Sequence, residues 1–447
     1  MSEQSMRPQN RWGVVIGAIL IQLALGAIYA WSVFTPALEA AGWSKFQTQL
    51  VFSVGLATFA IVMTFAGRLM GRLGPQKLAI AGGITLGVGY ALAGLLGADN
   101  FWVTLIFVGL VGGAGIGLGY VVPIAVGMRW FPDHKGMITG LAVAGFGFGA
   151  MGWVKAAGEW GHLLDGLGLS QTLMIYGAAF AALILVGSLW MRMPPKGWNP
   201  SGQQVAARVS PKGSENYSLV EMLRTPQFYL LFFTFAVSAG SGLMAVGLMK
   251  LYPMQALQAN GLSLAEASAI AGTAMAVFFS LANGIGRIAW GTISDRLGRR
   301  RSVAIMAGSQ AVLLFLFTSM AGNESLLYLG AALIGFNFGG NFALFPALTA
   351  DMFGNERVGQ NYPIVFLSYG AGGIIFPLLG GTLGDLGNFP LAFSICAGAC
   401  LVGMGATMLI RKPDIEEAHH AMSVHGFLHQ MHWDELEHAF EGHADKR

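Results

Sequence analysis

One arginine lies deep inside an apolar stretch of the chain. Arg287 ends the string Asn283-Gly284-Ile285-Gly286-Arg287, one helical turn before a polar loop. Placing such a side chain in lipid costs about 3 kcal/mol on insertion scales, so it is a functional candidate by default. No Asp or Glu lies at the same depth. A guanidinium without a carboxylate partner predicts an anion site, because its planar fork matches a carboxylate with two parallel hydrogen bonds. The alternative is that Arg287 reaches the membrane interface or bonds a backbone carbonyl.

Few other polar or aromatic side chains lie at this depth, and they are the ones that could complete an anion site. Asn283 lies four residues before Arg287 and shares its helix face, as Asn337 does with Asn341. Any single aromatic residue could instead serve helix packing, since the apolar stretches are aromatic-rich throughout. The predicted substrate-binding residues are Arg287, Asn283, Tyr120, Tyr29, Asn337, Asn341, Tyr369 and Trp31.

The remaining reactive side chains indicate no catalytic centre. Lys155 and Lys250 lie near the ends of apolar stretches, where long basic side chains extend to the interface. Cys396 and Cys400 are expected to be packing residues. The histidines of residues 413–447 are scattered, which favours an amphipathic surface helix over a metal site. No nucleophile with a base, metal cluster or carboxylate pair lies at mid-depth, so we expect neither an enzyme nor a cofactor or metal.

Most of the chain is too hydrophobic to belong to a water-soluble protein. Of its 447 residues 54% are hydrophobic and only 11% charged, a composition that makes the bilayer the solvent. The charges cluster between apolar stretches of roughly twenty residues, the length that crosses a hydrocarbon core of about 30 Å as a helix. A β-barrel needs alternating segments of about ten residues, which these are not. Twelve transmembrane helices are predicted, approximately at 12–36, 47–66, 78–97, 101–127, 136–157, 171–191, 226–251, 264–290, 302–321, 325–350, 358–380 and 390–410.

The basic residues orient these helices. Lys and Arg are retained on the cytoplasmic side of short loops, and with the N-terminus inside, the cytoplasmic segments hold 21 of the 25. The polar N-terminus lacks the features of a cleaved secretory signal, so we expect it to stay attached in the cytoplasm. Both termini of this multi-pass protein of the inner membrane should then be cytoplasmic. The net charge of +3 is a topology signal and leaves no basic face for nucleic acid.

One loop occurs twice in the chain. Residues 67–77 read Gly-Arg-Leu-Met-Gly-Arg-Leu-Gly-Pro-Gln-Lys, and residues 291–301, 224 positions later, read Gly-Thr-Ile-Ser-Asp-Arg-Leu-Gly-Arg-Arg-Arg. Pro123 and Pro346 are 223 positions apart, as are two glycine pairs of the fifth and eleventh stretches. One six-helix unit has therefore been duplicated, and because six is even, both copies enter the membrane in the same orientation. This is the organisation of an alternating-access carrier.

The expected fold is all-α and polytopic, with twelve transmembrane helices in two six-helix bundles. The linker between the bundles is rich in Pro, Gly, Ser, Gln and charge, as flexible linkers are. The predicted parts are a cytoplasmic N-terminus 1–11, an N-terminal bundle 12–191, the cytoplasmic linker 192–225, a C-terminal bundle 226–411 and a His-rich cytoplasmic tail 412–447.

The repeated loop resembles the signature of the major facilitator superfamily, in which a Gly, an acid, Arg, Gly and a basic cluster follow at fixed spacing. The second copy has Asp295, whereas Gly71 takes the place of the acid in the first. The resemblance implies that Asp295 and Arg296 help latch the halves together on the cytoplasmic side, with Arg68 and Arg72 at the matching loop of the first half. The alternative is that the loop only anchors helix ends to lipid head groups.

Residues 26–34, 337–346 and 349–354 are similar to strings of the oxalate/formate antiporter family. The Asn283-to-Arg287 spacing resembles that of the monocarboxylate transporters, whose eighth helix carries a substrate-binding Arg. The oxalate exchanger of the first family uses a second basic residue in helix 11, and here residues 358–380 contain no Lys or Arg. One deep cation favours a substrate with one negative charge.

We therefore expect a secondary transporter, acting as a monomer, that carries a small monocarboxylate of the lactate, pyruvate or formate type on Arg287 by proton-coupled symport. Glu39 and Glu266, near the external helix ends, are the acids that could carry the proton, which otherwise travels with the substrate. Exchange against a counter-anion is the competing prediction. A carboxylate sensor derived from a transporter, and a channel, are the alternatives of other classes.

Overall fold

The protein is described by a computed structural model that covers residues 11–131, 135–158, 160–195, 216–354 and 357–413. This part of the chain holds twelve helices long and apolar enough to cross a membrane, one for each predicted stretch, and no strand. The predicted all-helical polytopic fold is confirmed. The His-rich tail beyond residue 413 and residues 196–215 of the linker lie outside the described residues.

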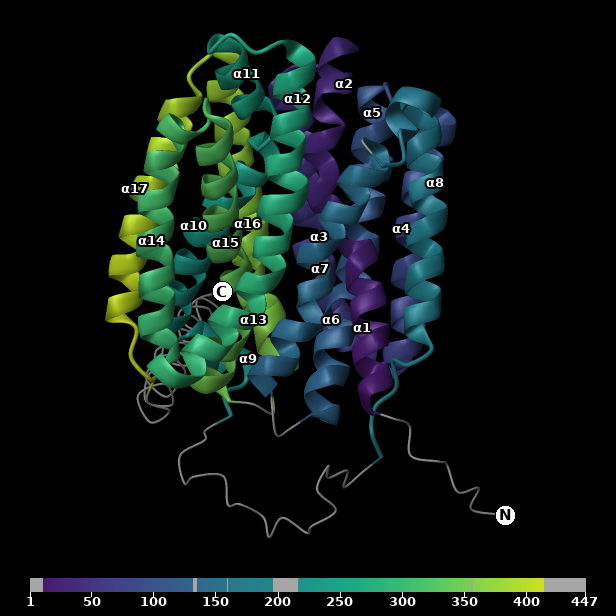
Figure 1. The fold of residues 1–447 in the computed structure, drawn as a ribbon. Coiled ribbons are helices and arrows are strands. Elements are labelled where there is room, and N and C mark those ends of the chain that lie inside the picture. The colour runs from purple at the N-terminus through teal and green to yellow at the C-terminus, as the bar shows by residue number, and fades with distance from the viewer. Residues whose placement is uncertain (1–10, 132–134, 159, 196–215, 355–356, 414–447) are drawn as a thin grey trace, which may run out of the picture.

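The N-terminal half contains the first six spans (Figure 1). Its first span is α-helical and then tightens to a 3₁₀-helix, and its fourth contains a π-helical segment, so several elements make up one span. The elements are α1 (Arg11–Leu25) with η1 (Gly26–Val33), the short α2 (Thr35–Ala40), α3 (Lys45–Leu73), α4 (Pro75–Leu96), α5 (Phe101–Thr104) with η2 (Leu105–Gly112) and α6 (Gly113–Trp130), α7 (Lys135–Ala157) and α8 (Leu163–Ser188).

The C-terminal half contains the other six. A π-helical segment again interrupts one span, the eighth. The elements are α9 (Leu219–Leu223), α10 (Pro226–Leu248), α11 (Leu251–Ala259), α12 (Leu264–Thr273) with η3 (Ala274–Phe279) and α13 (Ser280–Leu297), α14 (Arg299–Met320), α15 (Glu324–Phe353), α16 (Val358–Asp385) and α17 (Phe389–Leu409).

Some helix ends differ from the prediction. The sixth span begins at Leu163 rather than at 171, and Gly168 inside it has a φ of 79°. A residue with that backbone conformation interrupts the helical hydrogen bonding. The sequence before Gly168 was therefore predicted as part of a loop. The first span ends at Val33, because α2 is a separate short helix.

The duplicated loop has the same backbone conformation in both halves. Gly74 ends α3 with φ 82° and ψ 156°, and Gly298 ends α13 with φ 84° and ψ 145°. A positive φ is accessible to glycine without the steric cost that other residues incur, so each loop turns sharply into the next helix. The structural equivalence supports duplication of one six-helix unit.

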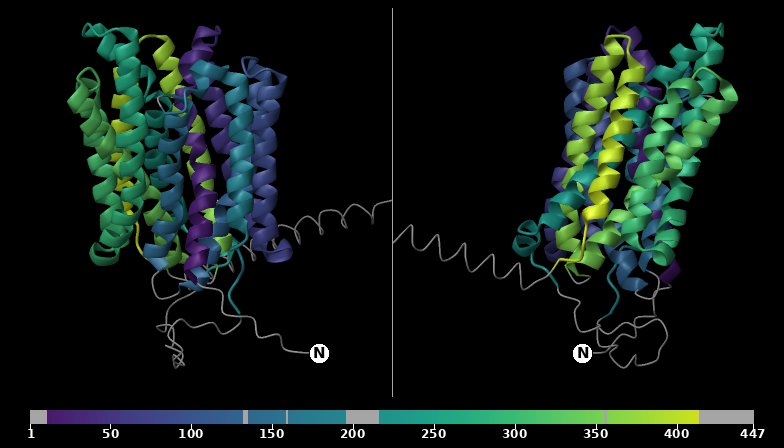
Figure 2. Two further views of the ribbon diagram at one scale, coloured as in Figure 1. Left: turned by 45° about the vertical axis from the view of Figure 1, so that its right-hand side comes forward. Right: turned by 90° about the vertical axis from the view of Figure 1, so that its left-hand side faces the viewer.

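The two halves lie side by side, with the N-terminal half in purple to blue and the C-terminal half in green to yellow (Figures 1 and 2). They meet through α3 against α16 and through α7 against α13. A Cβ on Gly147 of α7 would lie 2.7 Å from the backbone nitrogen of Gly284, and a Cβ on Gly370 of α16 would lie 2.7 Å from the Cβ of Ala60 on α3. The repeated glycines 223 positions apart thus both permit close contact between the halves.

The bundle has two ends, which we name by their short helices. The α2 face carries α2, α5 and α11, at the top of Figure 1, and the α9 face carries α9, at the bottom. Helix α17 lies on the outside of the bundle (Figure 2, right). The residues that can bind an anion lie between these faces, where the halves meet.

Candidate functional site

Arg287 lies on α13 at the contact between the halves, and its side chain is 0% exposed. Two glycines allow this burial. A Cβ on Gly286 would lie 2.1 Å from the carbonyl oxygen of Phe336 on α15, and one on Gly284 would lie 2.2 Å from the ring of Phe148 on α7. Helix α13 therefore packs tightly against both halves, and Arg287 is held between them.

The guanidinium is only partly satisfied by hydrogen bonds. Its Nε donates to Oδ1 of Asn283 at 3.2 Å, and its Nη1 donates to the carbonyl oxygen of Val143 on α7 at 3.0 Å. Among the described residues Nη2 has no partner, and no ion pair involves Arg287. Nη1 thus bonds a backbone carbonyl, which was the alternative role for Arg287, while Nη2 remains available to an anion. A buried donor left unsatisfied costs about 1–3 kcal/mol, which a bound carboxylate would recover.

Two aromatic rings hold the guanidinium in place. Its central carbon lies 4.1 Å from the ring centre of Phe342 on α15 and 5.4 Å from that of Phe146 on α7. Cation–π attraction of about 2 kcal/mol or more is typical of such desolvated pairs. One ring comes from each half, so both halves set the orientation of the charge.

Further aromatic residues surround this pair and form what we call the aromatic cage. The hydroxyls of Tyr29 on η1 and Tyr369 on α16 lie 3.1 Å apart, and the ring of Tyr29 packs on Phe146 and Phe338. Arg287 interacts electrostatically with the hydroxyls of both tyrosines. The cage comprises Tyr29, Phe59, Tyr120, Phe146, Phe338, Phe342, Phe366 and Tyr369.

Several buried polar atoms around the cage have no hydrogen-bond partner among the described residues. Tyr120 packs on Phe146, and its hydroxyl lies near the Arg287 guanidinium but forms no hydrogen bond of normal geometry. Asn283 uses its carbonyl oxygen for Arg287 and leaves its amide nitrogen free. The hydroxyl of Tyr362 is also unpaired and interacts electrostatically with Arg287. The donors Nη2, Nδ2 and the tyrosine hydroxyls are the groups that bind carboxylate oxygens.

Of the predicted substrate-binding residues, the structure brings Arg287, Asn283, Tyr29, Tyr120 and Tyr369 together. The other three make structural contacts. The Trp31 indole donates to the carbonyl oxygen of Thr48, and the Asn337 amide donates to the hydroxyl of Ser309. The Asn341 amide donates to the carbonyl oxygen of Phe338, and its own side-chain oxygen has no partner among the described residues.

The structure places the predicted latch residues at the α9 face. Asp295 pairs with Arg299 at 2.5 Å, and Arg299 also pairs with Asp351 at 3.2 Å. These three residues belong to α13, α14 and α15, so the network joins helices within the C-terminal half. The side chain of Asp295 is 46% exposed rather than buried. Arg296, Arg68 and Arg72 are exposed, and the last two line a cavity with Gln360 of α16.

The two acids predicted for proton coupling lie at the α2 face. Glu266 forms a capping box with Ser263 at the start of α12, where its carboxylate accepts from the Ser263 backbone at 3.0 Å. Glu39 lies 3.8 Å from the ammonium of Lys45 and is 25% exposed. Burial raises the pKa of the Glu39 carboxyl; the attraction of Lys45 opposes this increase, and the nearby Asp385 adds to it. Glu39 therefore takes up a proton at a higher pH than an exposed glutamate.

Sequence reasoning did not select Phe342, Phe146 or the carbonyl of Val143 as partners of Arg287. Phe342 lies one residue beyond the selected Asn341, but thirty phenylalanines in the chain give no signal to separate it from packing residues. Val143 and Phe146 are separated from Arg287 by more than 140 positions and meet it only because α7 packs on α13. Arg299, the centre of the α9-face network, was assigned only to the basic cluster of the loop.

Comparisons with known proteins show the family and the fold to which the chain is similar. A family model described as Major Facilitator Superfamily matches residues 14–279 and 241–426. An uncharacterised MFS-type transporter of Escherichia coli K12, YhjX, is 31% identical over 83% of this chain and 88% of its own length. The oxalate:formate antiporter of Oxalobacter formigenes is 27% identical over 87% of this chain and 88% of its own. The apicoplast pyruvate carrier 1 of Toxoplasma gondii is 23% identical and covers 85% of both chains.

A solved structure has the same fold. The crystal structure of the Escherichia coli fucose:proton symporter superposes with a TM-score of 0.61 at 16% sequence identity. The match covers 90% of this chain and 98% of that one. At this identity the similarity concerns the fold and not the ligand.

Proposed function

This chain belongs to the major facilitator superfamily, a family of multi-pass membrane transporters, and we propose that it carries a small monocarboxylate anion with the carboxylate bound at Arg287. The observation that carries the proposal is the unpaired Nη2 of a fully buried guanidinium at the contact between the halves. The nearby donors of Asn283 and Tyr120 provide further hydrogen bonds to the carboxylate oxygens.

The charge of the site supports a monoanion. Among the described residues Arg287 is the only Lys or Arg at mid-depth, and α16, which borders the cage, contains neither. The cage otherwise offers aromatic rings and hydroxyls, which suit the short apolar body of lactate, pyruvate or formate. Two of the relatives are named for small carboxylates, one for oxalate and formate and the other for pyruvate. Extending that substrate class to this chain is part of the proposal.

Transport follows from rocking of the halves about Arg287. Its contacts with Val143 and Phe146 cross between the halves, and so does the tyrosine pair. These contacts must break when the site opens to either side, and a bound carboxylate compensates for the lost partners. We propose that the protein acts as a monomer in the inner membrane with the α9 face and both termini on the cytoplasmic side, as the distribution of Lys and Arg indicates.

Proton-coupled symport is the proposed mode, and anion exchange is the second candidate. Exchange is favoured by one observation, the absence of an acid beside Arg287 among the described residues. An empty carrier would have to reorient with this charge uncompensated. Uptake driven by a proton gradient into vesicles without internal substrate supports symport, whereas uptake that needs internal anion supports exchange.

The proposal is tested with purified protein by thermal shift against formate, pyruvate, lactate and oxalate. We expect stabilisation by monocarboxylates and its loss in Arg287→Ala, since removing one partner of a buried charge pair costs about 2–5 kcal/mol, or at least about thirtyfold in affinity. Arg301→Ala is the matched control, because Arg301 is exposed at the α9 face. Stabilisation by a sugar or a cation and by no carboxylate would refute the anion site.

A further inference from the structure

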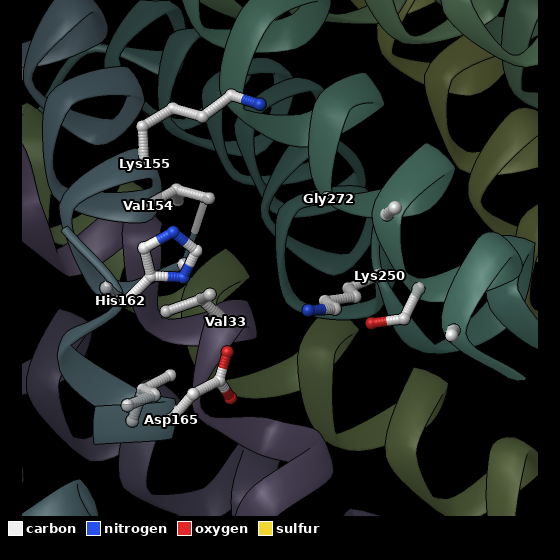
Figure 3. A pocket seen from close by; sticks show the side chains of 13 residues that line it. Val33, Val154, Lys155, His162, Asp165, Lys250 and Gly272 are labelled. Atoms are coloured by element: carbon white, nitrogen blue, oxygen red, sulfur yellow. The ribbon is translucent and has the colours of Figure 1, made fainter. Parts of the chain in front are cut away.

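A second cavity lies between the halves toward the α2 face, outside the aromatic cage (Figure 3). Its volume is about 410 Å³. The N-terminal half contributes the end of η1, the end of α7 and the start of α8, and the C-terminal half contributes Lys250 and α12. The cavity, which we call the vestibule, is lined among others by Val33, Lys155, His162, Asp165, Lys250 and Ser268.

Two lysines from opposite halves define the chemistry of the vestibule. Lys155 on α7 is only 5% exposed, and its ammonium donates to the hydroxyl of Thr273 on α12 at 3.4 Å. The expectation that Lys155 extends to the membrane interface is therefore wrong, because α12 covers it. Figure 3 shows the ammonium of Lys250 directed across the vestibule toward the N-terminal half.

The chemistry of the described lining favours a small anion. The lining residues include two lysines and one aspartate, Asp165, and the two ammonium groups are the donors that an anion would meet there. The rest of the lining is mostly Val, Ala, Leu and Gly, and such a low-dielectric wall focuses the field of the lysines. The volume lies in the range of small-ligand sites and exceeds what a small carboxylate fills, so the anion would bind together with water.

The vestibule and the cage share two elements. Val33 ends the 3₁₀-helix that carries Tyr29, and Lys155 follows Phe146 on α7 by nine residues, about 13 Å of helix rise. An anion bound in the vestibule therefore lies close to the cage that holds Arg287. The bond from Lys155 to Thr273 joins the halves, so an anion that competes for this ammonium also weakens a contact that closes the α2 face.

We propose that the vestibule is a second carboxylate site, which captures the anion at the α2 face with Lys155 and Lys250 before it moves to Arg287. The proposal rests on the proposed function for the identity of its ligand. It predicts two sites of different strength in one molecule, because the vestibule is wide and partly neutralised by Asp165, whereas Arg287 is fully buried.

The test measures two quantities with radiolabelled pyruvate. Uptake is measured in cells and in inverted vesicles, and the number of pyruvates bound is measured by equilibrium dialysis on purified protein. In Lys155→Gln/Lys250→Gln we expect the KM for entry from the α2 face to rise about tenfold, with kcat and entry from the α9 face unchanged. Raising the ionic strength should increase the same KM in the wild type and not in the variant. Asp165→Asn should lower that KM about twofold, and Lys77→Gln, which removes an exposed charge on α4, should leave it unchanged.

Dialysis separates this proposal from the proposed function. The wild type should bind two pyruvates. The lysine double variant should bind one pyruvate tightly, at Arg287, and Arg287→Ala should bind one weakly, at the vestibule. A single bound pyruvate in wild type, or an equal change of KM from both faces, would overturn the vestibule and leave Arg287 in place. If Arg287→Ala still binds pyruvate weakly, and the two lysine substitutions abolish that binding, the result would support the vestibule even if transport failed. Lys155→Arg/Lys250→Arg should keep the wild-type KM, which excludes a folding defect as the cause.

Discussion

The hydroxyls of Tyr29 and Tyr369 lie 3.1 Å apart, although 340 positions separate the two residues and they belong to opposite halves. Both hydroxyls also interact electrostatically with Arg287. The pair thus closes the aromatic cage over the charge and ties the halves together at the site itself. If bound carboxylate stabilises this closed arrangement, the tyrosine pair contributes to affinity without having to contact the substrate.

Tyr29→Phe and Tyr369→Phe should each lower carboxylate affinity about fivefold, since a buried hydrogen bond contributes about 1 kcal/mol. The double variant should lose no more than either single one, because both changes remove the same bond. Affinity is measured by the thermal shift of purified protein as a function of substrate concentration. Additive losses would mean that the two hydroxyls act independently.

Phe342→Leu should weaken carboxylate binding about thirtyfold, because it removes the ring 4.1 Å from the guanidinium carbon and with it about 2 kcal/mol of cation–π attraction. Phe342→Tyr should retain binding. The control is Phe345→Leu, which makes the same change in a ring that stacks on Phe235 within the C-terminal half. Equal losses in both leucine variants would indicate a packing defect.

Asp385→Asn should open the α2 face. The Asp385 carboxylate at the end of α16 accepts from the backbone nitrogens of Lys45 and Phe46 at 3.1 and 3.2 Å, so one half caps the first turn of α3 in the other half. Loss of the charge weakens this cap by about 0.3–1 kcal/mol. A cysteine at Ser268, which lines the vestibule, should then react faster with an impermeant maleimide.

The matched control for Asp385 is Asn388→Ala. Asn388 caps α17 within its own half, where its side chain accepts from the backbone nitrogen of Leu391 at 3.2 Å. The change removes a helix cap but no contact between the halves, so labelling at Ser268→Cys should not change. The native Cys396 and Cys400 are buried, which keeps the background reaction low.

Glu39→Gln should abolish the rise of uptake on acidification of the α2 side, if Glu39 carries the coupling proton. Burial raises the pKa of this carboxyl, so the folded protein binds the proton more tightly than the unfolded chain does. Stability therefore increases as the pH falls through the raised pKa and is lost as the pH rises through it. The variant should also lose that part of the pH dependence of its thermal unfolding.

Glu266→Gln is the control for the pH profile. Its carboxylate belongs to the capping box of α12, where glutamine can take the same place, so the change should alter helix stability little and leave the pH profile of uptake intact. A lost pH response in Glu266→Gln, with the response kept in Glu39→Gln, would reassign the proton.

Gly147→Ala should abolish transport, because its Cβ would lie 2.7 Å from the backbone nitrogen of Gly284 across the halves, where neither backbone can yield. Gly152→Ala on the same helix is the control, since nothing lies within 4 Å of its Cβ. Uptake and thermal stability are compared for both. Normal transport by Gly147→Ala would show that the halves do not need this close approach.

Much of the fold followed from local properties of the sequence. The length of each apolar stretch specified a membrane-spanning helix, and the spacing of Gly74 and Gly298 revealed the duplicated unit, which the matching backbone conformation of the two loops supports. Helix ends were predicted less well. The sixth span begins at Leu163, but its first turns contain Asp165 and Gly168, residue types that are typical of loops.

The central residue of the site was also readable, because the cost of burying an arginine in lipid is a property of the residue and its depth. Its partners were predicted only in part. Trp31 and Asn337 satisfy the same criteria of depth and polarity as Tyr120, yet they hydrogen-bond to Thr48 and Ser309. The difference lies in how each helix is rotated about its axis, and packing against neighbours decides that.

The sequence by itself therefore determined that this chain crosses a membrane twelve times in two related halves and holds one deep, uncompensated cation. Only the tertiary structure decided that Phe342 and Phe146 stack on Arg287, that Asp295 pairs with Arg299 within one half, and that Lys155 faces a cavity instead of the interface. Hydrophobic length and charge cost are summed along the chain, whereas these contacts depend on which helices are neighbours and which faces they present.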